Sequence, residues 1–147
     1  LNLISFNVIP NNKSIESIFI QIINSVAYIK TADSFWKKGL SSVFNSLKQI
    51  NSGEAYYINM LSNAELSLTG EPVNLPFTMN LKTGINMCGV VTESSVSITE
   101  LITGKNIDFI KNFEGAWFSS SSATINYMEP GKGYYIKVSA PTILIFE

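Results

Sequence analysis

Few residues in this sequence belong to types that do chemistry, and their spacing is unfavourable. The 147 residues include ten lysine and arginine residues, eleven acids, one cysteine and no histidine. Histidine is the usual general base and a common metal ligand, so Ser-His-Asp and Cys-His arrangements are excluded. Ser-Lys and paired-carboxylate chemistry stay formally open, but the acids are scattered through predicted turns: Asp33, Glu54, Glu65, Glu71, Asp108, Glu114 and Glu129. We therefore predict a protein that is not an enzyme, with no metal site and no cofactor.

Loops that bind calcium or phosphate are not recognisable either. No segment alternates Asp or Asn with Gly ahead of a terminal Glu. Gly104-Lys105 and Gly131-Lys132 lack the preceding glycine and the following hydroxyl of a phosphate loop. Gly131 is expected in a turn with positive φ instead. Cys88 lies in the apolar run 87–91 and is expected to be a buried structural thiol, because free cysteines are usually buried.

Aromatic residues are the remaining candidates for a binding site or interface. They are two adjacent tyrosine pairs and two tryptophans: Tyr56, Tyr57, Tyr134, Tyr135, Trp36 and Trp117. Adjacent residues of a strand point to opposite faces of the sheet, so one ring of each pair is expected in the core and the other at the surface. Exposed rings stack on sugars or pack into a neighbouring protein. The alternative, that all these aromatics pack two equivalent cores, stays open.

The composition limits the partners. A formal net charge of -1 gives no electrostatic reason to expect nucleic acid or an anionic membrane surface. No uninterrupted apolar stretch reaches the roughly 18 to 20 residues that span a bilayer, and no signal peptide is recognisable. The chain opens at Leu1 inside a strand-like run, as a processed mature protein or an excised segment would.

The two halves of the chain match each other in order, which indicates a tandem duplication. The matched segments are 2–6 with 86–90, 14–18 with 97–101, 28–30 with 109–111, Trp36 with Trp117, and 53–59 with 131–137. The offset falls from 84 (86 minus 2) to 78 (131 minus 53), as it does when two copies diverge by a few deletions. We predict two homologous repeats, residues 1–71 and 72–147, or one compact unit made of both.

Each repeat is predicted to contain mixed strands and one short amphipathic helix. In the first repeat, residues 1–9 form an aliphatic strand, and Ser14 caps a helix that extends to Ile23. Strand character resumes at 26–30, a weak helical pattern follows at 41–50, and strands are expected at 56–60 and 65–68. The second repeat has matching strands at 134–138 and 142–146. The predicted fold class is α+β, rich in β-structure, with the two repeats packed as a pseudo-symmetric pair.

The repeats differ at their beginnings. Residues 73–81 are a predicted strand ahead of the one that starts at Asn86, whereas the first repeat opens directly at its Asn2 strand. The first repeat is therefore one strand short, and the resulting sheet edge is open to a strand from another chain. The predicted strand-pairing edge consists of alternate residues of that first strand: Leu3, Ser5 and Asn7.

The two ends of the second repeat resemble a repeat of secreted and surface proteins of Gram-negative bacteria. Residues 84–87 are Gly-Ile-Asn-Met and residues 130–138 are Pro-Gly-Lys-Gly-Tyr-Tyr-Ile-Lys-Val. They are similar to that repeat's opening Gly-Trp-Asn-Leu and closing Pro-Gly-Lys-Gly-Tyr-Trp. The chain departs from the pattern where Leu1 and Ile85 stand for tryptophan, and at residues 51–55 (Asn-Ser-Gly-Glu-Ala). The resemblance implies an extracellular or cell-surface location.

Two functions are consistent with these features. The first is a structural or adhesive module, such as a filament or surface-layer subunit, that joins copies of itself or another surface protein by strand complementation. The second is a carbohydrate-binding module whose partner is a glycan.

Overall fold

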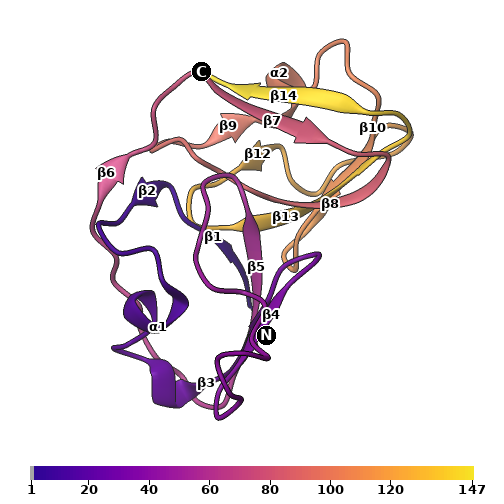
Figure 1. The fold of residues 1–147 in the computed structure, drawn as a ribbon. Coiled ribbons are helices and arrows are strands. Elements are labelled where there is room, and N and C mark those ends of the chain that lie inside the picture. Colours follow the sequence, from indigo (N-terminus) through magenta and orange to yellow (C-terminus); the bar gives the residue numbers. More distant parts are fainter. Residues whose placement is uncertain (1) are drawn as a thin grey trace.

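β-strands dominate the structure, a computed structural model that describes residues 2–147. The strands are joined by two single-turn α-helices and one 3-10 turn (Figure 1). This confirms the predicted β-rich α+β class. The place predicted for Leu1 in the first strand lies outside the described residues.

The first half of the chain forms one antiparallel four-stranded sheet with the order β1-β5-β3-β4. Its elements are β1 (Asn2–Ser5), β2 (Val8–Ile9), α1 (Ile15–Ile18), η1 (Ile23–Ser25), β3 (Val26–Lys30), β4 (Phe35–Lys37) and β5 (Ala55–Met60). The predicted strand at 26–30 is confirmed at both ends, and the strand predicted at 56–60 begins one residue earlier.

The second half forms another antiparallel four-stranded sheet, with the order β11-β10-β13-β8. Its elements are β6 (Glu71–Pro72), β7 (Phe77–Leu81), β8 (Gly84–Gly89), β9 (Val96–Ser97), α2 (Ile98–Leu101), β10 (Ile107–Lys111), β11 (Ala116–Phe118), β12 (Tyr127–Met128), β13 (Gly133–Val138) and β14 (Thr142–Phe146). Three further pairings are β9 with β12, β7 with β14, and β6 with β2 of the first half. β7 and β14 lie together along the outside of the second half (Figure 1).

The first helix is shorter than the sequence predicts. The cap is as expected, because the Ser14 side chain accepts a hydrogen bond from the Ser17 N–H at 3.3 Å. The helix nevertheless ends after one turn, whereas the predicted span is 14–23. The Ile22 N–H donates to the Phe19 carbonyl in a turn, and this bend lets the Phe19 ring become fully buried. Packing against the sheet has overridden a weak local preference.

Two other predicted elements of the first half are wrong. Residues 41–50 form no helix: 42–44 make a single turn, after which the Leu47 N–H donates to the Phe35 carbonyl beside β4. Residues 65–68 form no strand. Within residues 2–147, no backbone hydrogen bond joins 63–69 to another backbone group, and a strand exists only where a neighbour pairs with it.

Buried apolar side chains form two separate clusters. One draws its buried members from Phe6 to Ile58, and the other from Val73 to Phe146. Each cluster lies between its own sheet and its own short helix, so each half has a core of its own.

A short seam of backbone contacts joins the two sheets. The Ser5 N–H donates to the Gly131 carbonyl at 3.0 Å, and the Gly89 N–H donates to the Gly53 carbonyl at 2.8 Å. The Ser5 hydroxyl adds two bonds, donating to the Lys132 carbonyl and accepting from the Val90 N–H. Ser5 is itself buried, so these bonds form away from water, where an unpaired polar group is costly.

Two glycines make this approach possible. A Cβ atom added at Gly89 would lie 2.5 Å from the Glu54 carbonyl oxygen and 2.5 Å from the Ser5 Cβ. A Cβ atom added at Gly133 would lie 2.8 Å from the Ala55 Cβ. Both distances are well inside van der Waals contact, so the seam closes only where one strand lacks a side chain.

Because the seam has no room for a side chain at Gly89, adding one methyl group there should lower the stability of the protein. Gly89→Ala would force the Glu54 backbone away, and we expect the free energy of unfolding to fall by about 1 to 3 kcal/mol. Urea unfolding followed by circular dichroism measures the change. Ser120→Ala, at an exposed loop position, is the matched control and should change stability by less than about 0.5 kcal/mol. Equal stabilities of the two variants would contradict this account of the seam.

Candidate functional site

The two tryptophans do not form an exposed binding surface. Trp36, in β4, is only 5% exposed, and its indole N–H donates to a Glu16 carboxylate oxygen at 3.1 Å. Trp117, in β11, is half-buried and packs against the core of the second half. Trp36 therefore offers no free ring, and its position agrees with the alternative that these aromatic residues pack the two cores. Its neighbours Phe35 and Lys37 are exposed, and its pairing opposite Ile29 of β3 shows that it lies on the core face.

The tyrosine pairs divide between the two faces of each sheet. Tyr56 and Tyr134 are fully buried, and each hydroxyl accepts a hydrogen bond from a backbone N–H, from Asn51 at 2.6 Å and from Glu129 at 2.8 Å. Burial raises the pKa of both hydroxyls above the usual value. The prediction of one core ring in each pair is confirmed.

The outer rings are half-buried and already have neighbours. Tyr57 stacks on Tyr28 with the ring centroids 6.0 Å apart, and Phe113 of the second half meets its edge at 6.1 Å. The Lys30 ammonium lies 4.8 Å from the centre of the Tyr57 ring. Tyr135, the outer ring of the second pair, is half-buried in the same way. The Tyr57 ring is thus already in contact with two other rings and one ammonium group.

The predicted strand-pairing edge is largely occupied by the chain itself. Ser5 is bonded to the second half as described above, and the Asn7 side-chain amide donates to the Thr92 carbonyl at 3.3 Å. The side chain of Leu3 is buried beside Gly133. A foreign strand cannot pair along Ser5 and Asn7 without displacing the seam, so this part of the prediction needs correction.

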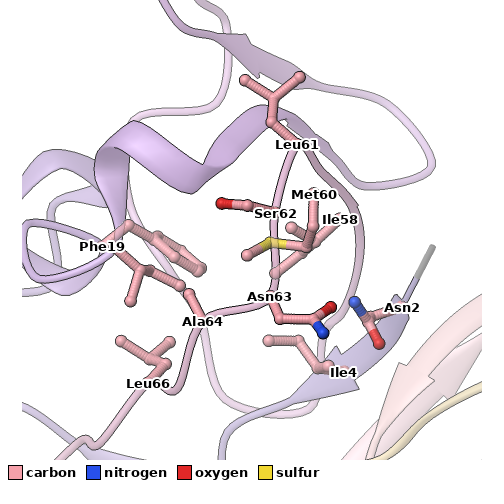
Figure 2. Close-up of a pocket in the computed structure, with 11 residues that line it drawn as sticks. Asn2, Ile4, Phe19, Ile58, Met60, Leu61, Ser62, Asn63, Ala64 and Leu66 are labelled. Atoms are coloured by element: carbon pink, nitrogen blue, oxygen red, sulfur yellow. The ribbon is translucent and has the colours of Figure 1, made fainter.

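The first half contains an open groove at a different place. The groove has a volume of about 580 Å³ and lies between the turn after α1, the end of β5 and segment 61–66. Figure 2 shows Phe19 and Leu66 on one side, Asn2 and Ile4 on the other, and Ile58 and Met60 between them. We call this the acceptor groove. Its floor is apolar core of the first half.

A smaller pocket lies at β1 beside the acceptor groove. Its volume is about 290 Å³, and Asn2 and Ile4 line both hollows. The smaller pocket ends at Gly131 and Lys132 on the far side of the seam. Lys132 forms ion pairs with Glu114 and Glu129, and these two hydrogen-bonded carboxylates raise the pKa of its ammonium.

In the second half, β7 and β14 cover the core, and another hollow of about 560 Å³ lies beside them, between β7, β8 and the turns at 31–33 and 52–55. Leu144 and Phe146 on β14 and Leu81 on β7 are fully or almost fully buried in the core. In the first half, Leu66 and Leu68 also pack against the core, but both stay half-exposed. The second core is therefore covered more completely than the first.

Comparisons with known proteins give no further guide to this site: no protein-family model matches the chain, and neither curated proteins nor solved structures gave a match. Among residues 2–147, no three histidine, cysteine or acidic side chains gather as metal ligands would. In the same part of the chain, no helix has the length and apolar character needed to cross a membrane.

The burial of Trp36 predicts a structural phenotype. Trp36→Ala would leave a cavity in the first core, and we expect a loss of about 3 to 5 kcal/mol in the free energy of unfolding. Trp117→Ala is the matched control, with a smaller loss because this side chain is half-buried. Urea titration of both variants measures the difference. A smaller loss for Trp36 than for Trp117 would contradict its place in the core.

The single thiol should be inert in the folded protein. Burial raises the pKa of Cys88 to about 12 from an ordinary value of 9.0, and the thiolate is the reactive form. At pH 8, we expect Ellman's reagent to label Cys88 at least about tenfold more slowly in buffer than in denaturant. Ser120→Cys adds an exposed thiol as the control and should react at once. Rapid labelling of native Cys88 would contradict its burial.

The raised pKa of Cys88 also determines how folding stability changes with pH. The folded thiol keeps its proton at pH values where the unfolded thiol loses it. The contribution of Cys88 to stability is therefore complete below pH 9 and declines as the pH rises from about 9 toward 12.

Proposed function

We propose that the chain is a non-enzymatic structural or adhesive module of an extracellular assembly, and that it binds a neighbour by accepting one of the neighbour's β-strands. The observation that carries the proposal is the acceptor groove, which opens onto the first core at the place where β7 and β14 cover the second.

The proposal includes a duplicated architecture, which the two sheet orders support. Read from the seam outward, β1-β5-β3-β4 corresponds to β8-β13-β10-β11, with every pair antiparallel. The seam bonds support it as well. At the offsets found in the sequence, Ser5 corresponds to Gly89 (5 plus 84) and Gly53 corresponds to Gly131 (53 plus 78). Replacing each residue by its counterpart therefore turns the bond from Ser5 to Gly131 into the bond from Gly89 to Gly53. Such an exchange is expected of two copies related by an approximate two-fold axis.

The buried tyrosines give independent support to the duplication. Tyr56 and Tyr134 differ by 78 in number, and each accepts a hydrogen bond from the backbone N–H five residues earlier. A local bond of the same kind, at the same place in two strands, is unusual without a common origin.

The same offset of 78 relates segment 64–68 of the first half to β14 of the second half. Leu66 and Leu68 correspond to Leu144 and Phe146 (144 minus 78 and 146 minus 78). In the second half this segment is the strand β14, and its only partner among the described strands is β7. In the first half the segment has the same alternation but no partner, so a strand from outside would restore the missing pairing.

The proposed location and partner class rest on the resemblance of residues 84–87 and 130–138 to surface-protein repeats. Another surface protein or another copy of the chain is the class of partner. The carbohydrate-binding alternative loses its main support because Trp36 is buried and Tyr57 is surrounded by other rings.

Substitutions in the acceptor groove test this function in cells that produce the protein. Leu66→Asp with Leu68→Asp places charge on the inward side of segment 65–68, whereas Glu65→Ala with Ser67→Ala changes its exposed side. We expect the inward pair, but not the outward pair, to release the chain from the high-molecular-mass surface fraction. Circular dichroism of both variants checks folding. Equal retention of the two folded variants in that fraction would overturn the proposal.

A further inference from the structure

We infer that the loop after β4, residues 38–46, docks the chain on an anionic lipid surface. Leu40, Val43 and Phe44 enter the interface of the bilayer, and lysines beside them contact the lipid headgroups. We call residues 38–46 the docking loop. The inference goes beyond the proposed strand binding and is independent of it, because no residue of this loop lines the acceptor groove.

The docking loop presents large apolar side chains to solvent. Val43 is 84% exposed, Phe44 is 67% exposed and Leu40 is 37% exposed. Val43 is the most exposed large apolar side chain within residues 2–147. Single exposed apolar residues are ordinary on a protein surface, but three within five residues form a patch of the kind that binds a partner.

A buried polar residue holds this loop in place. Asn45 is only 3% exposed, and its side-chain amide accepts a hydrogen bond from the Lys37 N–H at 2.8 Å and donates one to the Leu40 carbonyl at 3.3 Å. The Phe44 N–H donates to the Ser41 carbonyl at 2.9 Å and closes the turn. The apolar side chains are therefore in place before a partner arrives, so docking orders little of the chain.

Packing of the fold does not account for these apolar residues, as the second half shows. The carbonyls of Lys48 and Asn126 accept equivalent hydrogen bonds from the first residue of each short helix, at an offset of 78 (126 minus 48). At this offset, Val43 and Phe44 correspond to residues 121–122, which are two exposed serines. The same connection is thus made with polar residues in one half and with apolar residues in the other.

The charges around the docking loop favour an anionic partner. The formal net charge of -1 belongs to the whole chain, whereas residues 34–53 contain Lys37, Lys38 and Lys48 and no acid. The Lys48 ammonium donates to the Ser42 carbonyl within the loop, and the Lys38 ammonium donates to the Asn24 side chain at 2.8 Å. Within residues 2–147, none of these three exposed lysines forms an ion pair. Their positive charge is therefore available to a partner.

This combination of side chains fits a lipid surface better than a protein. Protein interfaces are depleted in lysine, and their strongest contacts come from tryptophan, tyrosine and arginine. Aliphatic and phenylalanine side chains with flanking lysines are instead typical of segments that lie in a membrane interface, where the apolar part enters the acyl boundary and the ammonium groups stay at the headgroups. The loop thus contacts the bilayer without crossing it.

Vesicle sedimentation of the whole chain tests the partner class. We expect partition onto phosphatidylcholine vesicles with about 30% phosphatidylglycerol to exceed partition onto pure phosphatidylcholine at least about tenfold, and to weaken as salt is added. No binding to either vesicle would overturn the inference. Equal binding to both would overturn the assigned anionic class.

Substitutions then assign the contact to the docking loop. Val43→Ser with Phe44→Ser should lower the partition at least about tenfold. Ile143→Thr with Ile145→Thr, the matched control, removes two exposed apolar side chains from β14 and should leave the partition unchanged. Circular dichroism checks that both variants fold. Equal losses for the two folded variants would contradict the role of the loop.

An environment-sensitive dye reports whether the loop enters the bilayer. Ser42→Cys and the control Ser120→Cys both place a thiol at an exposed position, and buried Cys88 does not compete for the label. On anionic vesicles, we expect the emission of a nitrobenzoxadiazole label at residue 42 to shift to the blue and intensify, and that of the label at residue 120 to stay unchanged. Equal responses at both positions would overturn the assigned orientation.

Two further outcomes would assign the loop to a protein partner and overturn the inference. In the first, the purified chain ignores vesicles while Val43→Ser with Phe44→Ser still releases it from the surface fraction of cells. In the second, sedimentation velocity shows self-association that the same pair of substitutions abolishes, so the loop binds a second copy. Neither outcome bears on the acceptor groove, which the substitutions at Leu66 and Leu68 test separately.

Discussion

The close approach of two backbones at the seam is the constraint on which the rest of the structure depends. Each contact joins a residue that has a Cβ atom to one that lacks it: Ser5 meets Gly89, and Ala55 meets Gly133. If both members carried a side chain, the Ser5 and Gly89 amides could not reach the carbonyls of Gly131 and Gly53. The two sheets would then separate, and buried polar groups would lose their partners.

This constraint explains the motif Pro130-Gly-Lys-Gly-Tyr134 in physical terms. Gly131 adopts a positive φ of +80°, which turns its carbonyl toward the Ser5 amide. Gly133 leaves room for β1 and Ala55, and the next ring, Tyr134, secures the turn through the Glu129 amide. In the first half, Ala55 takes the place of the second glycine. That substitution is tolerated because Gly133 lies across the seam. The motif therefore specifies contact between sheets, and it needs no ligand to account for it.

The sequence could predict what depends on local pattern and on order along the chain. Strands at 26–30 and 142–146 are found at their predicted bounds, because apolar β-branched runs between turn residues have few alternatives. The position of Trp36 could not be predicted, since it depends on pairing with Ile29 across a turn and on the reach of Glu16 from α1. The position of the groove beside segment 61–66 was not predicted either. The sequence indicated a missing strand but placed the free edge on β1, because the bonds from Ser5 and Asn7 to the second half join residues 85 and more apart.

The failure of residues 65–68 to form a strand is the most informative departure. Leu66 and Leu68 are more buried than Glu65 and Ser67, just as Leu144 and Phe146 are more buried than Ile143 and Ile145, so both segments alternate between core and solvent. They differ in two respects: β14 contains the strand-favouring residues Ile143, Ile145 and Phe146, and it pairs with β7, whereas within residues 2–147 segment 65–68 has no backbone partner. A strand is stabilised by its partner and not by propensity alone. Leu66 and Leu68 therefore cover the first core only in part, whereas Leu144 and Phe146, held by β7, close the second.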